Sequence, residues 1–408
     1  MGRKKIRFID LFAGASGLAE GFVRAGYMPV AHIEMNADAC FTVRTRSAYH
    51  FLHSIGKEDV YRDYLTGCIS RNELYRQVPA EIISSVINEE IKNETLDSIF
   101  AQIYDLLKGQ KVDIVIGGPP CQAYSLLGRH LKEMEDDPRT LLYLQYGRFL
   151  KEFSPKVFVF ENVPGLISAK RGEHFKNLQQ YFGDLGYRVH YEMLDAAEFG
   201  VPQNRKRLII VGWQENDDQG FPEIIKSPIP VTVNELFEDL PFLNAGEIQS
   251  ITGYRTPANP YLFQCGLRGK DEFVTQSITR PVNDSDAQIY RFVIDRWNKE
   301  RVRIGTPDIP ETMRTQNNIN SFVDRFKVID GHGISHTVIA HLAKDGHYYI
   351  HPDIRQCRSI SVREAARLQS FPDDFYFEGS RSAIFKQIGN AVPPLFAYRL
   401  ALSLRKML

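Results

Sequence analysis

The sequence has few cysteines, and no two of them lie close together. Among its 408 residues there are five cysteines, at positions 40, 68, 121, 265 and 357, and no C-x-x-C motif occurs. An odd number of widely spaced cysteines argues against a disulfide framework and against a zinc site built on cysteine. We therefore expect reduced thiols, an intracellular protein and no metal.

Long apolar runs and an excess of charge of one sign are also missing. No run of 18 apolar residues occurs, so we expect no membrane span. The N-terminus is basic, but Asp10, Glu20 and Arg24 follow soon after it, so we expect no secretory signal peptide. The 50 basic and 50 acidic side chains cancel. This balance argues against a tail or coat that binds nucleic acid by overall charge, and any contact with nucleic acid must come from local clustering of charge.

The composition is typical of a globular protein, with 43% hydrophobic and 25% charged residues. Strand and helix patterns alternate over 1–212 and return at the C-terminus, over 337–408, which predicts one α/β domain. Within it, 42–94 looks helical and charged, like an insertion. Residues 213–336 are rich in Pro, Asn, Gly and Thr and lack this alternation, so we expect a second, smaller domain there.

The N-terminal segment has the pattern of a strand, a glycine turn and a helix. Residues 6–11 predict a strand that runs into the turn 12–17, and 18–25 have helical spacing. This arrangement directs backbone N–H groups towards a ligand, although the three-glycine dinucleotide fingerprint is incomplete. A second strand over 28–33 ends at Glu34. An acidic residue about 20 positions beyond such a turn can accept hydrogen bonds from ribose hydroxyls; a solvated surface glutamate is the alternative.

A cysteine follows what we expect to be a buried parallel strand. The apolar run Val112–Ile116 is ended by two glycines and two prolines, and Cys121 comes next. Ligands of open α/β sheets bind outside the carboxyl ends of the strands. The proline pair would hold the backbone before the sulfur rigidly. A cysteine that merely follows a turn is the alternative reading.

A carboxyl group follows another short strand. Glu161 comes directly after the buried run Val157–Phe160, where a charge is costly unless it is paired or functional. Because both strands should end at the same edge of the sheet, Cys121 and Glu161 are candidates for one site.

Seven segments together resemble the DNA (cytosine-5)-methyltransferase family, and they occur in the family's order. They are DLFAGASGLAEGF (10–22), HIEMN (32–36), IGGPPCQAYS (116–125), FENVPG (160–165), PQNRKR (202–207), REAARLQSFP (363–372) and QIGNAVPP (387–394). The resemblance implies a Rossmann-like methyltransferase core dependent on S-adenosylmethionine, with 213–336 as a target-recognition domain. Two departures are Ser16, where many members have glycine, and a long segment between Glu34 and Cys121.

The resemblance also implies a mechanism. Carbon 5 of cytosine is a poor nucleophile, and addition of the Cys121 thiolate at carbon 6 would activate it. A free cysteine has a pKa of about 8.5, so the site needs positive charge, which Arg205 and Arg207 could help to supply. Glu161 would hold or donate a proton at ring nitrogen 3, oriented by Arg207. The cytosine must rotate out of the duplex, and 122–137 resembles the family's mobile catalytic loop.

S-adenosylmethionine is the methyl donor that the resemblance implies, with S-adenosylhomocysteine as product. The glycine turn would bind its methionine end, Glu34 its ribose and Met35 its adenine. The longer segment makes the family's acidic adenine contact hard to place, and Asp97 is our candidate. The expected binding residues are Phe12, Gly14, Gly17, Glu34, Met35, Asp97, Pro119, Leu142, Asn390 and Val392. Core packing is the alternative for Leu142 and Val392, and a turn cap for Asn390.

Double-stranded DNA is the expected partner, read by loops of 213–336. Arg255, Arg268 and Arg280 are candidate readers that the sequence cannot rank. Arg363 and Glu364 would brace the second domain against the first, or form a surface ion pair.

We also expect a cognate restriction endonuclease, a monomeric state and a cytoplasmic location, which in a prokaryote would be at the nucleoid. The histidines at 332, 336, 341, 347 and 351 invite a metal hypothesis, but polar positions on strands and turns explain them better.

Three other functions compete with this one. The first is a tRNA cytosine-5 methyltransferase on the same core, against which the long 213–336 segment argues. The second is a catalytically silent DNA-binding regulator, against which the presence of Cys121, Glu161 and both arginines argues. The third is a nicotinamide dehydrogenase, which the Pro-Pro-Cys turn and the incomplete fingerprint disfavour.

Overall fold

A seven-stranded sheet forms the centre of the computed structural model, which describes residues 5–120, 142–227, 231–314 and 323–408. The strand order is β3-β2-β1-β4-β5-β7-β6. The first five strands of this order run parallel, and β7 runs antiparallel to both of its neighbours. The strands are β1 (Arg7–Leu11), β2 (Met28–Glu34), β3 (Val86–Asn88), β4 (Ile114–Gly117), β5 (Val157–Asn162), β6 (Tyr187–Asp195) and β7 (Lys206–Gln214).

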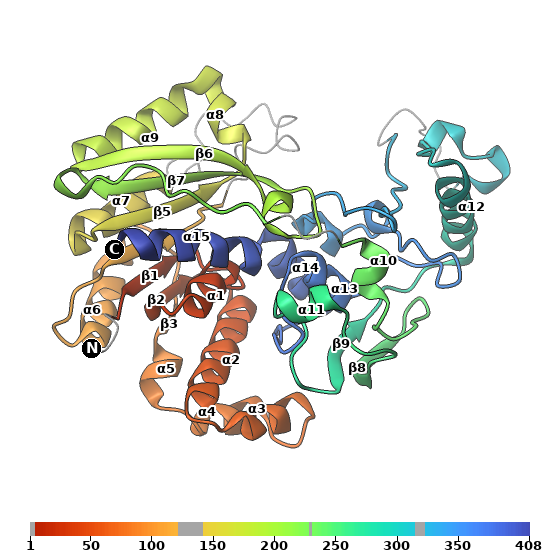
Figure 1. Cartoon of the computed structure of the whole chain (residues 1–408), viewed down its shortest axis with the longest axis horizontal. Helices are drawn as coiled ribbons and strands as arrows, with labels where there is room; N and C mark the ends of the chain where they lie inside the picture. Colours follow the sequence, from red (N-terminus) through yellow and green to blue (C-terminus); the bar gives the residue numbers. More distant parts are fainter. Residues whose placement is uncertain (1–4, 121–141, 228–230, 315–322) are drawn as a thin grey trace.

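Helices cover both faces of this sheet because successive strand residues point to opposite sides. Phe8 of β1 and Ile116 of β4 pack in a core with α1 (Gly17–Arg24) and α15 (Pro394–Met407), which lie side by side (Figure 1). Ile9 and Val115 face a second core with three other helices. These are α6 (Leu96–Leu107), α7 (Leu142–Phe153) and α9 (Glu173–Asp184). The expected α/β fold, with strands buried on both faces, is confirmed.

The segment 42–94 is mostly helical, as expected, but part of it belongs to the central sheet. It contains most of α2 (Ala37–Ser54), then α3 (Glu58–Leu65), α4 (Arg71–Arg76) and α5 (Ala80–Ser84). It also supplies β3, which pairs with β2 at the edge of the sheet. Because β3 has three residues, its apolar pattern is too short to be recognised in the sequence. This part of the segment is therefore no insertion on the scaffold.

Residues 213–336 form two parts with different cores. The first contains α10 (Val233–Phe237), α11 (Pro260–Gln264) and the antiparallel pair β8 (Ile248–Gly253) and β9 (Phe273–Ile278), and its buried side chains join the core of α1 and α15. The second contains α12 (Asp284–Glu300), which lies away from the central sheet (Figure 1) and has a small core of its own.

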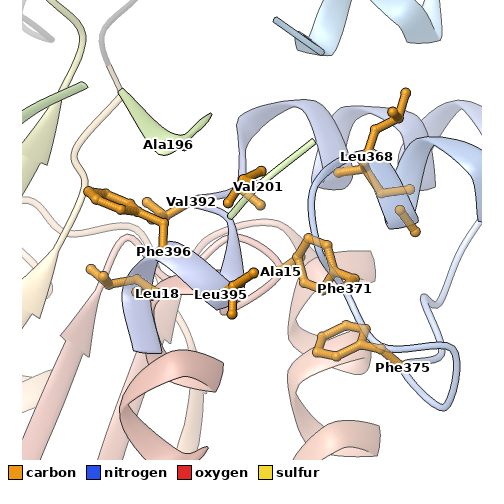
Figure 2. Packing of buried hydrophobic residues seen from close by; sticks show 14 of the residues in the cluster. Ala15, Leu18, Ala196, Val201, Leu368, Phe371, Phe375, Val392, Leu395 and Phe396 are labelled. Carbon is orange, nitrogen blue, oxygen red and sulfur yellow. The ribbon is translucent and has the colours of Figure 1, made fainter. Parts of the chain in front are cut away.

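The C-terminal helices complete the first core. They are α13 (Val362–Leu368), α14 (Arg381–Asn390) and α15, and α13 begins with a capping box of Ser361 and Glu364. Figure 2 shows side chains of 368–396 packed with Ala15, Leu18 and Val201. The two ends of the chain therefore form one body. The remaining short helices are α8 (Gly165–Ser168) and the 3-10 turns Ala169–Gly172, Ala196–Phe199, Glu215–Asp217, Thr306–Asp308, Glu311–Met313, Ala340–Ala343 and His347–Tyr349.

Candidate active site

Glu34 holds the glycine turn at the carboxyl ends of β1 and β2. Its Oε2 accepts a hydrogen bond of 2.8 Å from the backbone N–H of Gly14, and its Oε1 accepts one of 2.8 Å from that of Asn36. Burial raises the pKa of Glu34, and the two backbone hydrogen bonds oppose this increase. Gly14 has a left-handed φ of +54°, and no heavy atom lies within 4 Å of the place where its Cβ would be. The hydrogen bond from Gly14 to Glu34 thus fixes the turn, while the space next to the Cα of Gly14 is open.

Gly17 and Val392 meet where the two ends of the chain come together. A Cβ on Gly17 would lie 2.2 Å from the backbone oxygen of Val392 and 3.3 Å from Cβ of Ala391. Val392 itself is buried in the core shown in Figure 2. Glycine at 17 therefore permits close approach of α1 to the segment before α15. These contacts agree with the alternative interpretation of Val392, in which its side chain packs in the core and does not bind the cofactor.

Glu161 and Arg207 form an ion pair across neighbouring strands. Arg207 Nε lies 2.8 Å from Glu161 Oε1, and the two side chains are 12% and 11% exposed. β5 and β7 pair antiparallel, which brings the end of one strand beside the start of the other. The guanidinium therefore keeps one carboxylate oxygen in a fixed direction.

The turn before Cys121 lies against the same carboxylate. A Cβ on Gly118 would be 2.7 Å from Glu161 Oε2, and Asn162 Nδ2 donates a hydrogen bond of 3.4 Å to the carbonyl of Pro119. The Gly-Gly-Pro-Pro turn and Glu161 are thus adjacent, as the common strand edge predicts. Cys121 and the loop 122–137 lie outside the described residues.

Arg205 has surroundings different from those expected of it. Its side chain is buried, with 1% exposure. Nη1 donates to the carbonyl of Val338 at 2.6 Å, and Nη2 donates to those of Ala391 at 2.8 Å and Gly389 at 3.2 Å. These contacts anchor Val338 and the segment before α15, and the positive charge that Arg205 was expected to supply near the thiol stays a prediction. Arg207, by contrast, reaches Glu161.

The other predicted binding residues lie at element ends. Met35 follows β2 and is 63% exposed, Leu142 begins α7 and is half-buried, and Asn390 ends α14 and is exposed. Phe12 lies in the glycine turn with a φ of +56° and packs against the second core.

The prediction for Asp97 remains untested. Asp97 is exposed in the first turn of α6. The end of β3 instead presents Asn88, whose Nδ2 donates to the carbonyls of Glu34 at 3.1 Å and Met35 at 3.0 Å. The sequence offered no reason to consider Asn88, because the short strand β3 was read as part of an insertion.

A family comparison decides the identity of the chain. The family model of the C-5 cytosine-specific DNA methylases matches residues 73–406. The chain belongs to this family. It is therefore a DNA (cytosine-5)-methyltransferase, and the nicotinamide dehydrogenase alternative is excluded. The family's reaction is methylation dependent on S-adenosylmethionine.

Curated relatives of this DNA (cytosine-5)-methyltransferase match it over nearly its whole length. The type II methyltransferase M.Bpa9945I of Bacillus paralicheniformis is 37% identical over 98% of both chains. The type II methyltransferase M.DdeI of Desulfomicrobium norvegicum is 30% identical and covers 97% of this chain and 88% of its own. Among solved structures, one described as a DNA modification methyltransferase encoded within an E. coli prophage has a TM-score of 0.66 at 22% identity over 99% of both chains. This last likeness supports the fold.

The residues at the strand ends fit S-adenosylmethionine. The Glu34 carboxylate is an acceptor suited to ribose hydroxyls, and the side of the turn at Gly14 is open. Met35 offers exposed apolar surface next to Glu34, and Asn88 offers an amide at the adjoining strand end.

The candidate target readers in 213–336 are not equivalent. Arg268 donates to Asp239 Oδ2 at 2.8 Å and stacks on Tyr254, and Arg280 donates to the carbonyls of 342 and 343 at 3.0 and 2.8 Å. Both hold the fold together. Arg255 is exposed and is the remaining candidate.

Buried arginines of α13 join this segment to the core. Arg363, fully buried, donates to the carbonyl of Thr275 at 3.0 Å, so the expected brace exists. Its expected companion Glu364 pairs instead with Arg358, at 2.7 Å. Arg367 binds two buried carboxylates, those of Asp239 and Asp373.

The histidines at 332, 336, 341, 347 and 351 were considered as possible metal ligands. Among the residues described, no three His, Cys, Asp or Glu side chains are grouped so as to hold a metal ion. His336 contacts the carbonyl of Tyr348 at 2.7 Å, and His347 contacts the hydroxyl of Tyr290 at 2.8 Å. Within the described ranges, no helix is both long and apolar enough to cross a membrane.

Proposed function

We propose that this DNA (cytosine-5)-methyltransferase is the modification enzyme of a type II restriction-modification system. It would methylate carbon 5 of a cytosine that has rotated out of a specific double-stranded sequence, through a covalent adduct with Cys121. The observation that carries the proposal is the Glu161–Arg207 pair, which lies directly against the turn that leads to Cys121. The type II relatives named above support the link to a restriction system and a cognate endonuclease.

The proposed mechanism assigns one role to each of three side chains. The deprotonated sulfur of Cys121 adds to carbon 6, and a proton on the Glu161 carboxyl passes to ring nitrogen 3, so that no negative charge remains on the ring. Arg207 holds the carboxyl in place through its 2.8 Å contact. When bound, S-adenosylmethionine supplies an electrophilic methyl group for carbon 5. Loss of the carbon 5 proton to a base then releases the thiolate, and return of the ring nitrogen 3 proton to the Glu161 carboxylate restores the neutral ring.

The cofactor would lie at the ends of β1, β2 and β3. Glu34 would accept hydrogen bonds from the ribose, Met35 would cover the adenine, and the N–H groups of the turn around Gly14 would bind the methionine end. We replace Asp97 by Asn88 as the residue beside the adenine, because Asn88 ends the strand next to Glu34. Arg205 would act indirectly by holding the 389–391 segment.

The chain would consist of a catalytic domain, formed by 1–212 and 337–408, and a recognition domain, formed by 213–336, which would read the target sequence. Arg255 would contact DNA there, while Arg268 and Arg280 would stabilise the fold of the recognition domain.

We further propose that the enzyme acts as a monomer in the compartment that holds the DNA. Size-exclusion chromatography with light scattering tests the oligomeric state, and a dimer would contradict it.

Bisulfite sequencing of DNA from cells that express the chain tests the function. We expect 5-methylcytosine in one sequence context, and none after Cys121→Ser or Glu161→Gln. The same treatment of cellular tRNA tests the competing RNA substrate. Methylated tRNA with unmethylated DNA would refute the proposal, and no methylation of either would favour the silent regulator.

A further inference from the structure

Three buried polar side chains meet beside the glycine turn, and the mechanism above does not use them. Asp10 lies in β1, His32 lies in β2, and Ser16 is the residue before α1. Ser16 Oγ and His32 Nδ1 each lie 3.0 Å from Asp10 Oδ2, and they are 3.2 Å from each other. The residues are 1%, 5% and 3% exposed in the order Asp10, Ser16, His32. A carboxylate buried this far depends on its hydrogen bonds.

Ser16 is an unfavourable residue for its backbone position. Its φ of +59° and ψ of 30° are left-handed, a conformation that L residues with a Cβ seldom adopt and that glycine adopts freely. Its hydroxyl makes no capping hydrogen bond to α1, although serine is common before helices for that purpose. The Ser16 hydroxyl therefore stabilises this part of the chain through its hydrogen bond to Asp10, and not by capping α1.

The contacts do not form a nucleophilic triad. Both contacts of His32 use the same nitrogen, Nδ1, so the ring does not bridge serine and aspartate through its two nitrogens as a catalytic histidine does. The cluster is better suited to holding a segment of backbone.

Glu34 and the cluster hold the same turn at two points. Glu34 accepts from the N–H of Gly14, and Asp10 accepts from the hydroxyl of Ser16. We propose that Asp10, Ser16 and His32 are positioning residues, which keep the turn in the conformation that binds the methionine end of S-adenosylmethionine. The inference rests on the proposed binding of the cofactor at this turn.

Binding of S-adenosylhomocysteine to the full chain, measured by calorimetry, tests the inference together with steady-state kinetics. Ser16→Ala keeps the Cβ and loses the hydroxyl. We expect the Kd for S-adenosylhomocysteine and the KM for S-adenosylmethionine to rise roughly ten- to a hundredfold, the effect of one lost hydrogen bond to a charged group. The KM for DNA should not change. Ser16→Gly removes the backbone strain as well, so it should fold at least as well as Ser16→Ala. Many family members have glycine here, but in this chain the change takes from the buried Asp10 one of its two side-chain partners, so we expect weak cofactor binding from this variant too.

Thr45→Val is the matched control. Thr45 is buried in the middle of α2, where its hydroxyl donates to Glu378 Oε1 at 2.7 Å and contacts the Tyr75 hydroxyl at 3.0 Å. We expect a lower free energy of unfolding and an unchanged Kd for S-adenosylhomocysteine.

The outcomes separate the two levels of the proposal. A wild-type chain that does not bind S-adenosylhomocysteine refutes the proposed cofactor site itself. If the wild type binds and Ser16→Gly binds equally well, the positioning role is wrong. This holds even if Ser16→Ala fails to fold, because the glycine variant suits the left-handed backbone. If Thr45→Val weakens binding of S-adenosylhomocysteine as much as Ser16→Ala does, general destabilisation of the fold explains the effect, and the positioning role is wrong.

Discussion

Replacing Gly118 by alanine should slow catalysis by displacing the Glu161 carboxylate. The new Cβ would lie 2.7 Å from Glu161 Oε2, short of the 3.4 Å at which ordinary contact begins by about 0.7 Å. The carboxylate is the end of a side chain and can move away, whereas the turn is attached to a buried strand. Because Arg207 Nε lies 2.8 Å from the other carboxylate oxygen, that movement stretches or breaks the ion pair.

The expected loss follows from the pair that is broken. A hydrogen bond to a charged group contributes about 1.5–3 kcal/mol. If that energy orients Glu161 in the transition state, kcat should fall by roughly ten- to a hundredfold. The free energy of unfolding should fall by no more than this contact contributes, because Gly118 is partly exposed and its φ is not left-handed, so the substitution adds no backbone strain.

Single-turnover methyl transfer to a DNA substrate that contains the target sequence measures the effect. Gly183→Ala is the control, since its Cβ would enter open space in α9, and helix propensity favours alanine by about 1 kcal/mol. We expect that control to keep the wild-type rate. A Gly118→Ala variant with the wild-type rate would refute the role assigned to the Glu161–Arg207 pair.

Three further predictions concern stability, and urea titration measures each of them. Gly17→Ala places a Cβ 2.2 Å from the backbone oxygen of Val392, so two backbone segments must separate, and the free energy of unfolding should fall by about 1–3 kcal/mol; an unchanged midpoint would contradict this. Arg367→Leu leaves two buried aspartates without their shared partner and should cost about 3–5 kcal/mol. Glu34→Gln should change the pH dependence, because burial raises the pKa of Glu34. Between the ordinary glutamate pKa and this raised value the folded chain binds more protons than the unfolded one, so the wild type should lose stability as pH rises through that window, and the variant should not.

Several features were predictable because they are encoded locally. The buried strands β4 and β5, the glycine turn and the capping box of Ser361 depend on residues a few positions apart. β3 was not predictable, since its three residues carry too little pattern. Asn88 was missed with it.

The sequence by itself determined the family, the α/β core and the strand ends at which polar groups gather, because ordered motifs and periodic burial do not depend on distant contacts. Only the tertiary structure decided the partners of those groups. Arg205 and Arg207 are two positions apart, yet one holds the carbonyls of 338, 389 and 391 and the other holds Glu161. That choice depends on which strands and loops lie beside β7, and pairing between segments distant in the chain is set by the packing of the whole sheet.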